Sequence, residues 1–153
     1  MNVKRPITPG ITLGDQPTES DLRALKDEGY VGVVNLRNDG EPEQPLGTAA
    51  EGAAARGLGL DYLHYGVGSA PLTEAGVGSV CEFLDRHAGD GKVMVHCRRG
   101  GRAAALVLLY QAQRNGWSPD EALAKGKAMG LEVEGGLRTL VENYLKEHPA
   151  SGG

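Results

Sequence analysis

The sequence predicts a single α/β domain, and three observations support this fold class. Short apolar runs alternate along the chain with segments that carry helix-start signals and one apolar face, as expected for a sheet covered by helices. The length of 153 residues suits one ordinary domain. No internal repeat and no change of composition marks a linker. We therefore expect one domain over residues 1–153, with about four strands in a mostly parallel sheet flanked by helices, an ordered core at residues 11–147 and a tail at residues 148–153.

Four segments have the composition of strands. Residues 30–36 (YVGVVNL) are apolar and rich in Val, which is typical of a buried strand. Residues 60–65 (LDYLHY) alternate between apolar and polar side chains, like a half-buried strand. Shorter runs at residues 11–13 and 92–96 complete the predicted sheet. The polar stretch at residues 37–45 must then be a loop at the carboxyl end of a strand.

Helices are predicted between the strands from their start and stop signals. Thr18 with Asp21 three residues later resembles a capping box, and Gly29 supplies a stop. Residues 48–56 are rich in Ala, and Thr73 can cap a third helix whose apolar face includes Cys81. Further helices are expected at residues 103–115, after Ser118-Pro119 and around Leu137.

Composition and charge exclude several classes of function. A net charge of -4 argues against non-specific nucleic-acid binding, which needs a basic surface. The two cysteines, Cys81 and Cys97, form neither a disulfide framework nor a zinc motif, and the histidines lack metal-ligand spacing. No run of apolar residues is long enough to span a membrane. We therefore expect a cytoplasmic protein without metal, cofactor, nucleic-acid or membrane partner, while the oligomeric state stays open.

The clearest indication of a reactive site is the run Val-His-Cys-Arg-Arg-Gly-Gly-Arg at residues 95–102. Gly100 and Gly101 allow the backbone to turn its amides inward, where they can hold the oxygens of a tetrahedral anion. A helix that begins near Arg102 directs its positive end at the same point and favours a thiolate at Cys97. The guanidinium of Arg102 can bind two anion oxygens and stabilise developing charge. The pattern therefore predicts Cys97 as a nucleophile in an anion-binding loop.

Other residues of this run have two interpretations each. Arg98 and Arg99 suit an anionic substrate, or are general surface charge. His96 is expected to orient the loop by hydrogen bonds rather than to act as a base, because neighbouring strand residues point to opposite faces. Cys97 itself could be a small buried apolar residue, although its position between a strand, two glycines and a helix favours the functional interpretation.

At these residues the sequence resembles cysteine-dependent phosphatases of the tyrosine and dual-specificity type, which carry His-Cys-(x)5-Arg. It resembles more closely the family of the beta-lactamase-hydrolase-like protein, phosphatase-like domain, from Ile11 to about Leu137. The shared motifs are Gly14-Asp15-Gln16-Pro17, Asn35-Leu36-Arg37, Asp39-Gly40-Glu41, the loop from Cys97 to Arg102, and the Gly130 region. The resemblance implies a phosphatase-like α/β fold with Cys97 as nucleophile and Arg102 as anion clamp.

The loop departs from the tyrosine-phosphatase pattern in two respects. Arg102 lies five positions after Cys97 rather than six, a loop length that resembles rhodanese sulfurtransferases. Ala103 stands where phosphatases usually keep a Ser or Thr whose hydroxyl helps to expel the thiolate, so turnover of a phosphocysteine could be slow.

A third departure concerns the general acid that protonates the leaving oxygen. Residues 66–70 (GVGSA) lack the aspartate that phosphatases usually place there. Asp39 or Glu41 is the best substitute, because their loop could reach the same carboxyl edge of the sheet. The alternative is that this loop is simply a solvated turn.

Three functions stay open on these observations. The first is a cysteine-dependent phosphatase that acts on phosphate monoesters, in which Arg98, Arg99, Gly100 and Gly101 bind the substrate. The second is a sulfurtransferase that takes sulfur from thiosulfate or a persulfide and forms a persulfide on Cys97. The third is a non-catalytic phosphate-binding module. All three imply an anionic partner.

Overall fold

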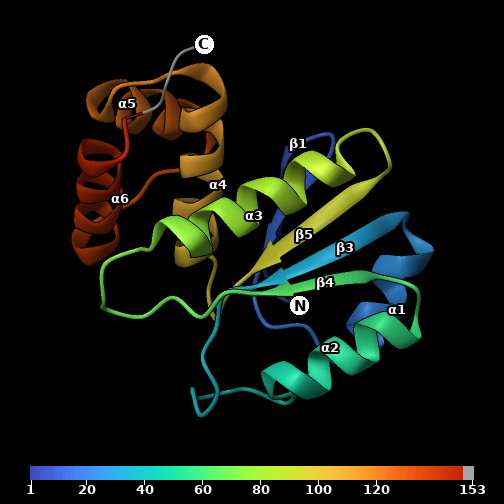
Figure 1. Ribbon diagram of the computed structural model, residues 1–153. Coiled ribbons are helices and arrows are strands. Elements are labelled where there is room, and N and C mark those ends of the chain that lie inside the picture. Colours follow the sequence, from blue (N-terminus) through green and yellow to red (C-terminus); the bar gives the residue numbers. More distant parts are fainter. Residues whose placement is uncertain (150–153) are drawn as a thin grey trace.

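A computed structural model describes residues 1–149 and contains a five-stranded sheet (Figure 1). The strand order is β1-β2-β5-β3-β4, with all neighbours parallel except β1 and β2, which are antiparallel. The strands are β1 (Lys4–Thr8), β2 (Ile11–Gly14), β3 (Tyr30–Asn35), β4 (Asp61–His64) and β5 (Lys92–His96). The predicted α/β fold with a mostly parallel sheet is thereby confirmed.

Strand β1 is the element that the sequence pattern did not reveal. It is short and contains Pro6, and its first three residues are exposed. It lies at the edge of the sheet, where an exposed position tolerates proline. The sheet therefore has one strand more than the four expected, and the ordered part of the chain begins before residue 11.

Residues 1–149 form six helices, of which α1 to α4 contact the sheet and α5 and α6 pack on α4 (Figure 1). Helices α1 and α2 lie on one face, and α3 to α6 lie on the other. Their bounds are Glu19–Asp27, Thr48–Gly57, Glu74–His87, Gly101–Asn115, Pro119–Met129 and Gly135–Glu147. The predicted capping box forms at Thr18, and a second one forms at Ser118; each hydroxyl accepts a hydrogen bond from the third helical amide.

The two faces of the sheet carry separate apolar cores. The larger core contains Val95 and Cys97 of the β5 region together with most of α4, whose residues 103–110 are all buried. The smaller core places Met94 against α1 and α2. Because side chains alternate along a strand, His96 shares the face of Met94 and not that of Cys97.

Strand β5 and helix α4 form the centre of the fold. Strand β5 lies between β2 and β3, and α4 packs against α3, α5 and α6. The loop that joins them contains Cys97 and ends at Gly100, which has a φ of 103° and precedes the first residue of α4. A β-carbon is unfavourable in that conformation, so glycine permits the turn.

The described part of the chain contains neither a helix suited to cross a membrane nor a candidate metal site. None of its helices combines the length and apolarity that a membrane-crossing segment needs. Within residues 1–149, no three or more His, Cys, Asp or Glu side chains are grouped in a way that could hold a metal ion. The end of the expected tail, residues 150–153, lies outside the described residues.

A pair of glycine substitutions tests the packing of α5 on α4. A β-carbon at Gly126 would lie 2.5 Å from Leu108 Cδ1 and 3.2 Å from the Leu131 carbonyl oxygen, whereas one at Gly78 of α3 meets no atom within 4 Å. We expect Gly126→Ala to lower the free energy of unfolding by about 1–3 kcal/mol through overpacking. Gly78→Ala should raise it by about 0.5–1 kcal/mol, because alanine favours a helix interior. Urea unfolding measures both, and a Gly126→Ala variant at least as stable as the wild type would contradict the close approach of α5 to α4.

Candidate active site

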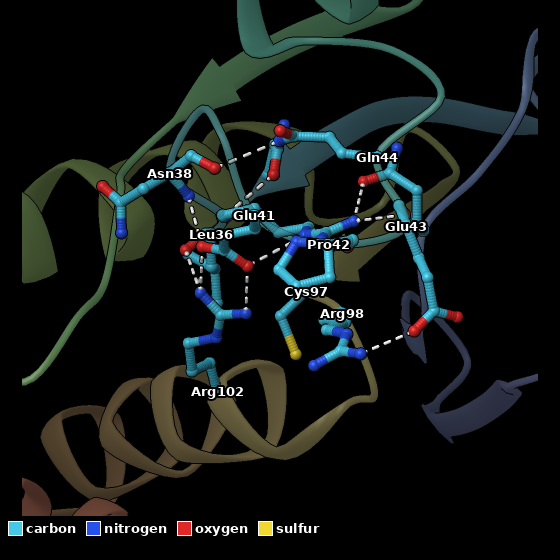
Figure 2. Close-up of polar contacts among 12 residues, drawn as sticks. Leu36, Asn38, Glu41, Pro42, Glu43, Gln44, Cys97, Arg98 and Arg102 are labelled. Atoms are coloured by element: carbon cyan, nitrogen blue, oxygen red, sulfur yellow. Dashed lines mark hydrogen bonds and ion pairs between the residues drawn. The ribbon is translucent and has the colours of Figure 1, made fainter.

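Cys97 lies at the carboxyl end of β5, at the floor of a small pocket. Its side chain is only 1% exposed, yet its Sγ accepts a hydrogen bond from the Gly100 amide at 3.0 Å. The pocket has a volume of about 210 Å³. Its lining residues are Cys97, Arg98, Arg99, Gly101, Arg102 and Leu137. In Figure 2 the sulfur points between Arg98 and Arg102 rather than toward the loop of Glu41. The thiol is therefore buried but faces a cavity.

The amino end of α4 borders this pocket. The first hydrogen bond within the helix runs from the Ala104 amide to the Gly100 carbonyl, at 2.9 Å. The preceding helical amides lack an intrahelical acceptor, and Gly100 has no side chain that could cap them. Amides in this position, with the positive end of the helix dipole, bind anions. The pocket thus suits a small oxyanion beside the sulfur.

Arg102 is held by a paired contact with Glu41 (Figure 2). One guanidinium nitrogen lies 2.8 Å from Glu41 Oε2 and the other 2.7 Å from Oε1. The first nitrogen also donates to the Val67 carbonyl at 3.1 Å. The hydrogen bonds with Glu41, and to a lesser extent the nearby Cys97, raise the pKa of Arg102 above its ordinary value. Arg102 is therefore a fixed cation next to the sulfur.

Both carboxylate oxygens of Glu41 accept hydrogen bonds. The hydrogen bonds from Arg102 lower its pKa to about 2, with help from the Asn38 amide at 2.7 Å and the Arg37 Nε at 3.0 Å, against the opposing effect of burial. A group with this pKa carries no proton at neutral pH. The geometry thus argues against the expected role of Glu41 as a general acid and makes it the partner that orients Arg102.

The carboxylate of Asp39 contacts the start of α2 and not the Cys97 pocket. Its two oxygens accept hydrogen bonds from the Thr48 amide at 2.8 Å and the Thr48 hydroxyl at 3.0 Å, at the start of α2. These bonds, the backbone one first, lower the pKa of Asp39. Asp39 lines neither pocket that Arg102 borders. The expectation that Asp39 supplies the proton is therefore not supported, because the carboxylate is engaged with α2.

The two other arginines of the loop differ from each other. Arg98 forms an ion pair with Glu43 at 2.5 Å, and Glu43 adopts a positive φ of 56°. The Arg98 Nε is buried and, in the described part of the chain, has no hydrogen-bond partner. Arg99 is exposed. Both arginines border the Cys97 pocket and a second cavity that contains Asp15.

His96 is fully buried on the opposite face of the sheet. Its Nε2 lies 2.6 Å from Glu51 Oε2 of α2, and its Nδ1 lies 3.5 Å from the Cys97 carbonyl oxygen. Sequence reasoning missed Glu51, because nothing distinguishes it within an Ala-rich helix. It also gave no role to Arg37 and Gln16, although both lie in the motifs quoted for the resemblance.

A larger groove adjoins the Cys97 pocket. It has a volume of about 750 Å³ and shares Arg102 and Leu137 with the smaller pocket. Val67 and Leu140 add apolar surface, and Glu134, the N-cap residue of α6, adds a carboxylate. The groove can therefore receive an apolar organic group attached to an anion at Cys97.

Comparison with known sequences agrees with these features. The family described as "Beta-lactamase hydrolase-like protein, phosphatase-like domain" matches residues 4–114. The beta-lactamase hydrolase-like protein of Xylella fastidiosa is 32% identical over 143 residues, which are 93% of this chain and 32% of that protein. The phosphatidylglycerophosphate phosphatase PTPMT1 of Arabidopsis thaliana is 32% identical over 117 residues, which are 73% of this chain and 33% of that protein. The chain thus spans about a third of the length of these curated relatives.

Solved structures share the fold. PTPMT1 in complex with PI(5)P has a TM-score of 0.74 at 22% identity, covering 94% of this chain and 95% of the other. Tk-PTP in its active form has a TM-score of 0.75 at 20% identity, covering 95% of this chain and 97% of the other. These likenesses confirm the tyrosine-phosphatase-like fold. Together with the match over residues 4–114, they lead to the conclusion that the chain belongs to the beta-lactamase hydrolase-like protein, phosphatase-like domain family.

Proposed function

We propose that the chain is a cysteine-dependent phosphatase that acts on phosphate monoesters. The observation that carries the proposal is the position of Cys97 Sγ, in one pocket with the amino end of α4 and with Arg102. A thiol without an anion site would be an ordinary buried cysteine, and an anion site without a nucleophile would only bind. The family and the fold support the same activity.

The reaction follows from this arrangement. The Cys97 thiolate attacks phosphorus, the bond from phosphorus to the substrate's ester oxygen breaks, and a phosphocysteine forms. The α4 amides and Arg102 hold the three other oxygens of the transferring group. Water then attacks phosphorus, the sulfur–phosphorus bond breaks, and Cys97 leaves as a thiolate with release of inorganic phosphate.

The groove beside Arg102 suggests the kind of substrate. Its apolar wall, formed by Val67, Leu137 and Leu140, would contact the organic part of the ester. Related proteins are named for phosphatidylglycerophosphate, or bound to PI(5)P, which are phosphate esters with apolar chains. We therefore propose an anionic phosphate monoester with an apolar portion as substrate. Both cysteines are free thiols, so we also propose a reducing compartment, the cytoplasm.

Sulfur transfer is the second candidate, and the loop length favours it. Four residues separate Cys97 and Arg102, as in the rhodanese-like pattern. This reaction would leave a persulfide on Cys97 and would need no acid for a leaving oxygen.

Substitution of each cysteine separates these functions. Cys97→Ser should abolish phosphate release from p-nitrophenyl phosphate. Cys81→Ser should retain it, because burial raises the pKa of Cys81 to about 11 and leaves a neutral thiol. The measurements are phosphate release and the intact mass of the protein, with thiosulfate assayed in parallel. Activity in Cys97→Ser would disprove the proposal, a persulfide without phosphate release would favour sulfur transfer, and phosphate binding without turnover would indicate a binding module.

We further propose that Glu134 protonates the leaving oxygen, because Asp39 and Glu41 are engaged elsewhere and Glu134 lines the groove with Arg102. Glu134→Gln should slow hydrolysis of an alkyl phosphate about 100-fold or more, the usual contribution of general acid catalysis. It should slow p-nitrophenyl phosphate far less, since nitrophenolate leaves without a proton. Glu132→Gln, an exposed neighbour, is the control. If Glu134→Gln slowed the hydrolysis of both substrates by the same factor, this role would be contradicted.

The pH dependence of stability tests the charge of Glu41. Its pKa falls from 4.5 to about 2 on folding, so the carboxylate stabilises the fold above pH 4.5 and this contribution is lost as the pH falls toward 2. The contribution is of order 3 kcal/mol, at about 1.4 kcal/mol per pKa unit. Urea unfolding between pH 7 and pH 2.5 should therefore show a steeper loss of stability in the wild type than in Glu41→Gln. Parallel curves would show that the ion pair with Arg102 does not form in solution.

A further inference from the structure

Glu51 is a carboxylate buried where packing alone would not require one. Its side chain is fully buried, although it lies in the Ala-rich helix α2. One oxygen lies 2.6 Å from His96 Nε2, and the other accepts a hydrogen bond from Gln16 Nε2 at 2.8 Å. Burial of a carboxylate costs several kcal/mol unless it is paired and hydrogen-bonded. Both of its oxygens are so engaged, with partners that adjoin the Cys97 loop.

The contacts of Glu51 continue to the other end of that loop. Gln16 Oε1 accepts a hydrogen bond from Arg37 at 2.8 Å, and the Arg37 Nε donates to Glu41 at 3.0 Å. Glu41 in turn holds Arg102. The chain of contacts therefore begins at the residue before Cys97 and ends at the last residue of the anion-binding loop. We call it the buried network, and its members are His96, Glu51, Gln16, Arg37, Glu41 and Arg102.

The hydrogen-bond partners of His96 indicate its charge. Nε2 faces the Glu51 carboxylate and Nδ1 faces the Cys97 carbonyl oxygen, so each ring nitrogen faces an acceptor. A ring that donates from both nitrogens is an imidazolium. Tyr62, the other titratable group beside Glu51, stays neutral, because burial raises the pKa of its hydroxyl above the ordinary range.

Positive charge surrounds Cys97. Arg98, Arg99 and Arg102 line its pocket, and an imidazolium at His96 adds a positive charge beside the Cys97 carbonyl oxygen. Nearby cations favour the thiolate over the thiol. The Glu51 carboxylate pairs with this imidazolium, whose burial without a partner would be costly.

We propose that Glu51 is a positioning residue that, through His96, fixes the start of the anion-binding loop and keeps Cys97 a thiolate. The inference rests on the proposed function for the role of Cys97 as nucleophile. The reactivity of Cys97 toward an alkylating reagent, however, can be measured without any phosphate substrate.

The experiment compares Glu51→Gln with the parent protein, both carrying Cys81→Ser so that Cys97 is the single thiol. The amide keeps an oxygen for the His96 N–H but removes the charge. We expect the midpoint pH for alkylation of Cys97 by iodoacetamide to rise by about one unit, which slows alkylation about 10-fold at a pH well below the midpoint of the parent protein. For p-nitrophenyl phosphate, kcat should fall by a similar factor while KM changes less, because Arg102 and the α4 amides still bind the phosphate. Glu82→Gln, an exposed carboxylate on α3, is the matched control.

Two outcomes would overturn the proposal. The first is a folded Glu51→Gln protein with unchanged alkylation and kcat and only a lower free energy of unfolding, which would assign Glu51 to stability alone. The second needs no variant: nitrogen NMR of the parent protein should show two protonated ring nitrogens at His96, and a neutral ring would remove the positive charge through which Glu51 is proposed to act on Cys97. If Glu51→Gln slowed alkylation of Cys97 but the parent protein released no phosphate, the inference would stand and the phosphatase proposal would be refuted.

Discussion

The paired contact between Glu41 and Arg102 is the interaction on which the rest of the site depends. It joins the loop after β3 to the first turn of α4, two segments that are 61 residues apart in the sequence. A guanidinium on a flexible stem would otherwise sample many positions, and anion binding would have to restrict it. Because the carboxylate holds both terminal nitrogens, Arg102 is already oriented for the anion binding that we propose. The same contact keeps Glu41 ionised, which removes it from proton transfer.

The loop that contains Cys97 is held by the two central elements of the fold. Strand β5 is central in the sheet, and α4 is buried along most of its length, so the loop between them is anchored at both ends. The larger apolar core, on the face of the sheet that carries α3 and α4, packs against this loop through Cys97 and Ala103. The other face holds the charged partners of His96 and the side chain of Arg37, where hydrogen bonds and not apolar contacts define their positions.

Charged side chains are seldom fully buried, so a cluster of them at the edge of a core is unusual. Apolar side chains of similar volume are often at least as stabilising as a buried ion pair. The retention of Arg37, Glu51 and His96 at zero exposure is therefore understood through what they do for the loop beside them.

The sequence by itself determined the elements that local patterns encode. These are the four parallel strands, the capped helices and the loop from Cys97 to Arg102, whose residues are consecutive and thus share one short segment. It could not reveal β1, because an exposed edge strand has no apolar pattern, nor the role of Glu41, whose proton affinity depends on a partner far along the chain. Glu51 looked like any solvent-facing glutamate of a helix. Only the packing of α2 against the sheet decided that it would meet His96, because burial and charge pairing are properties of the assembled fold and not of the neighbouring sequence.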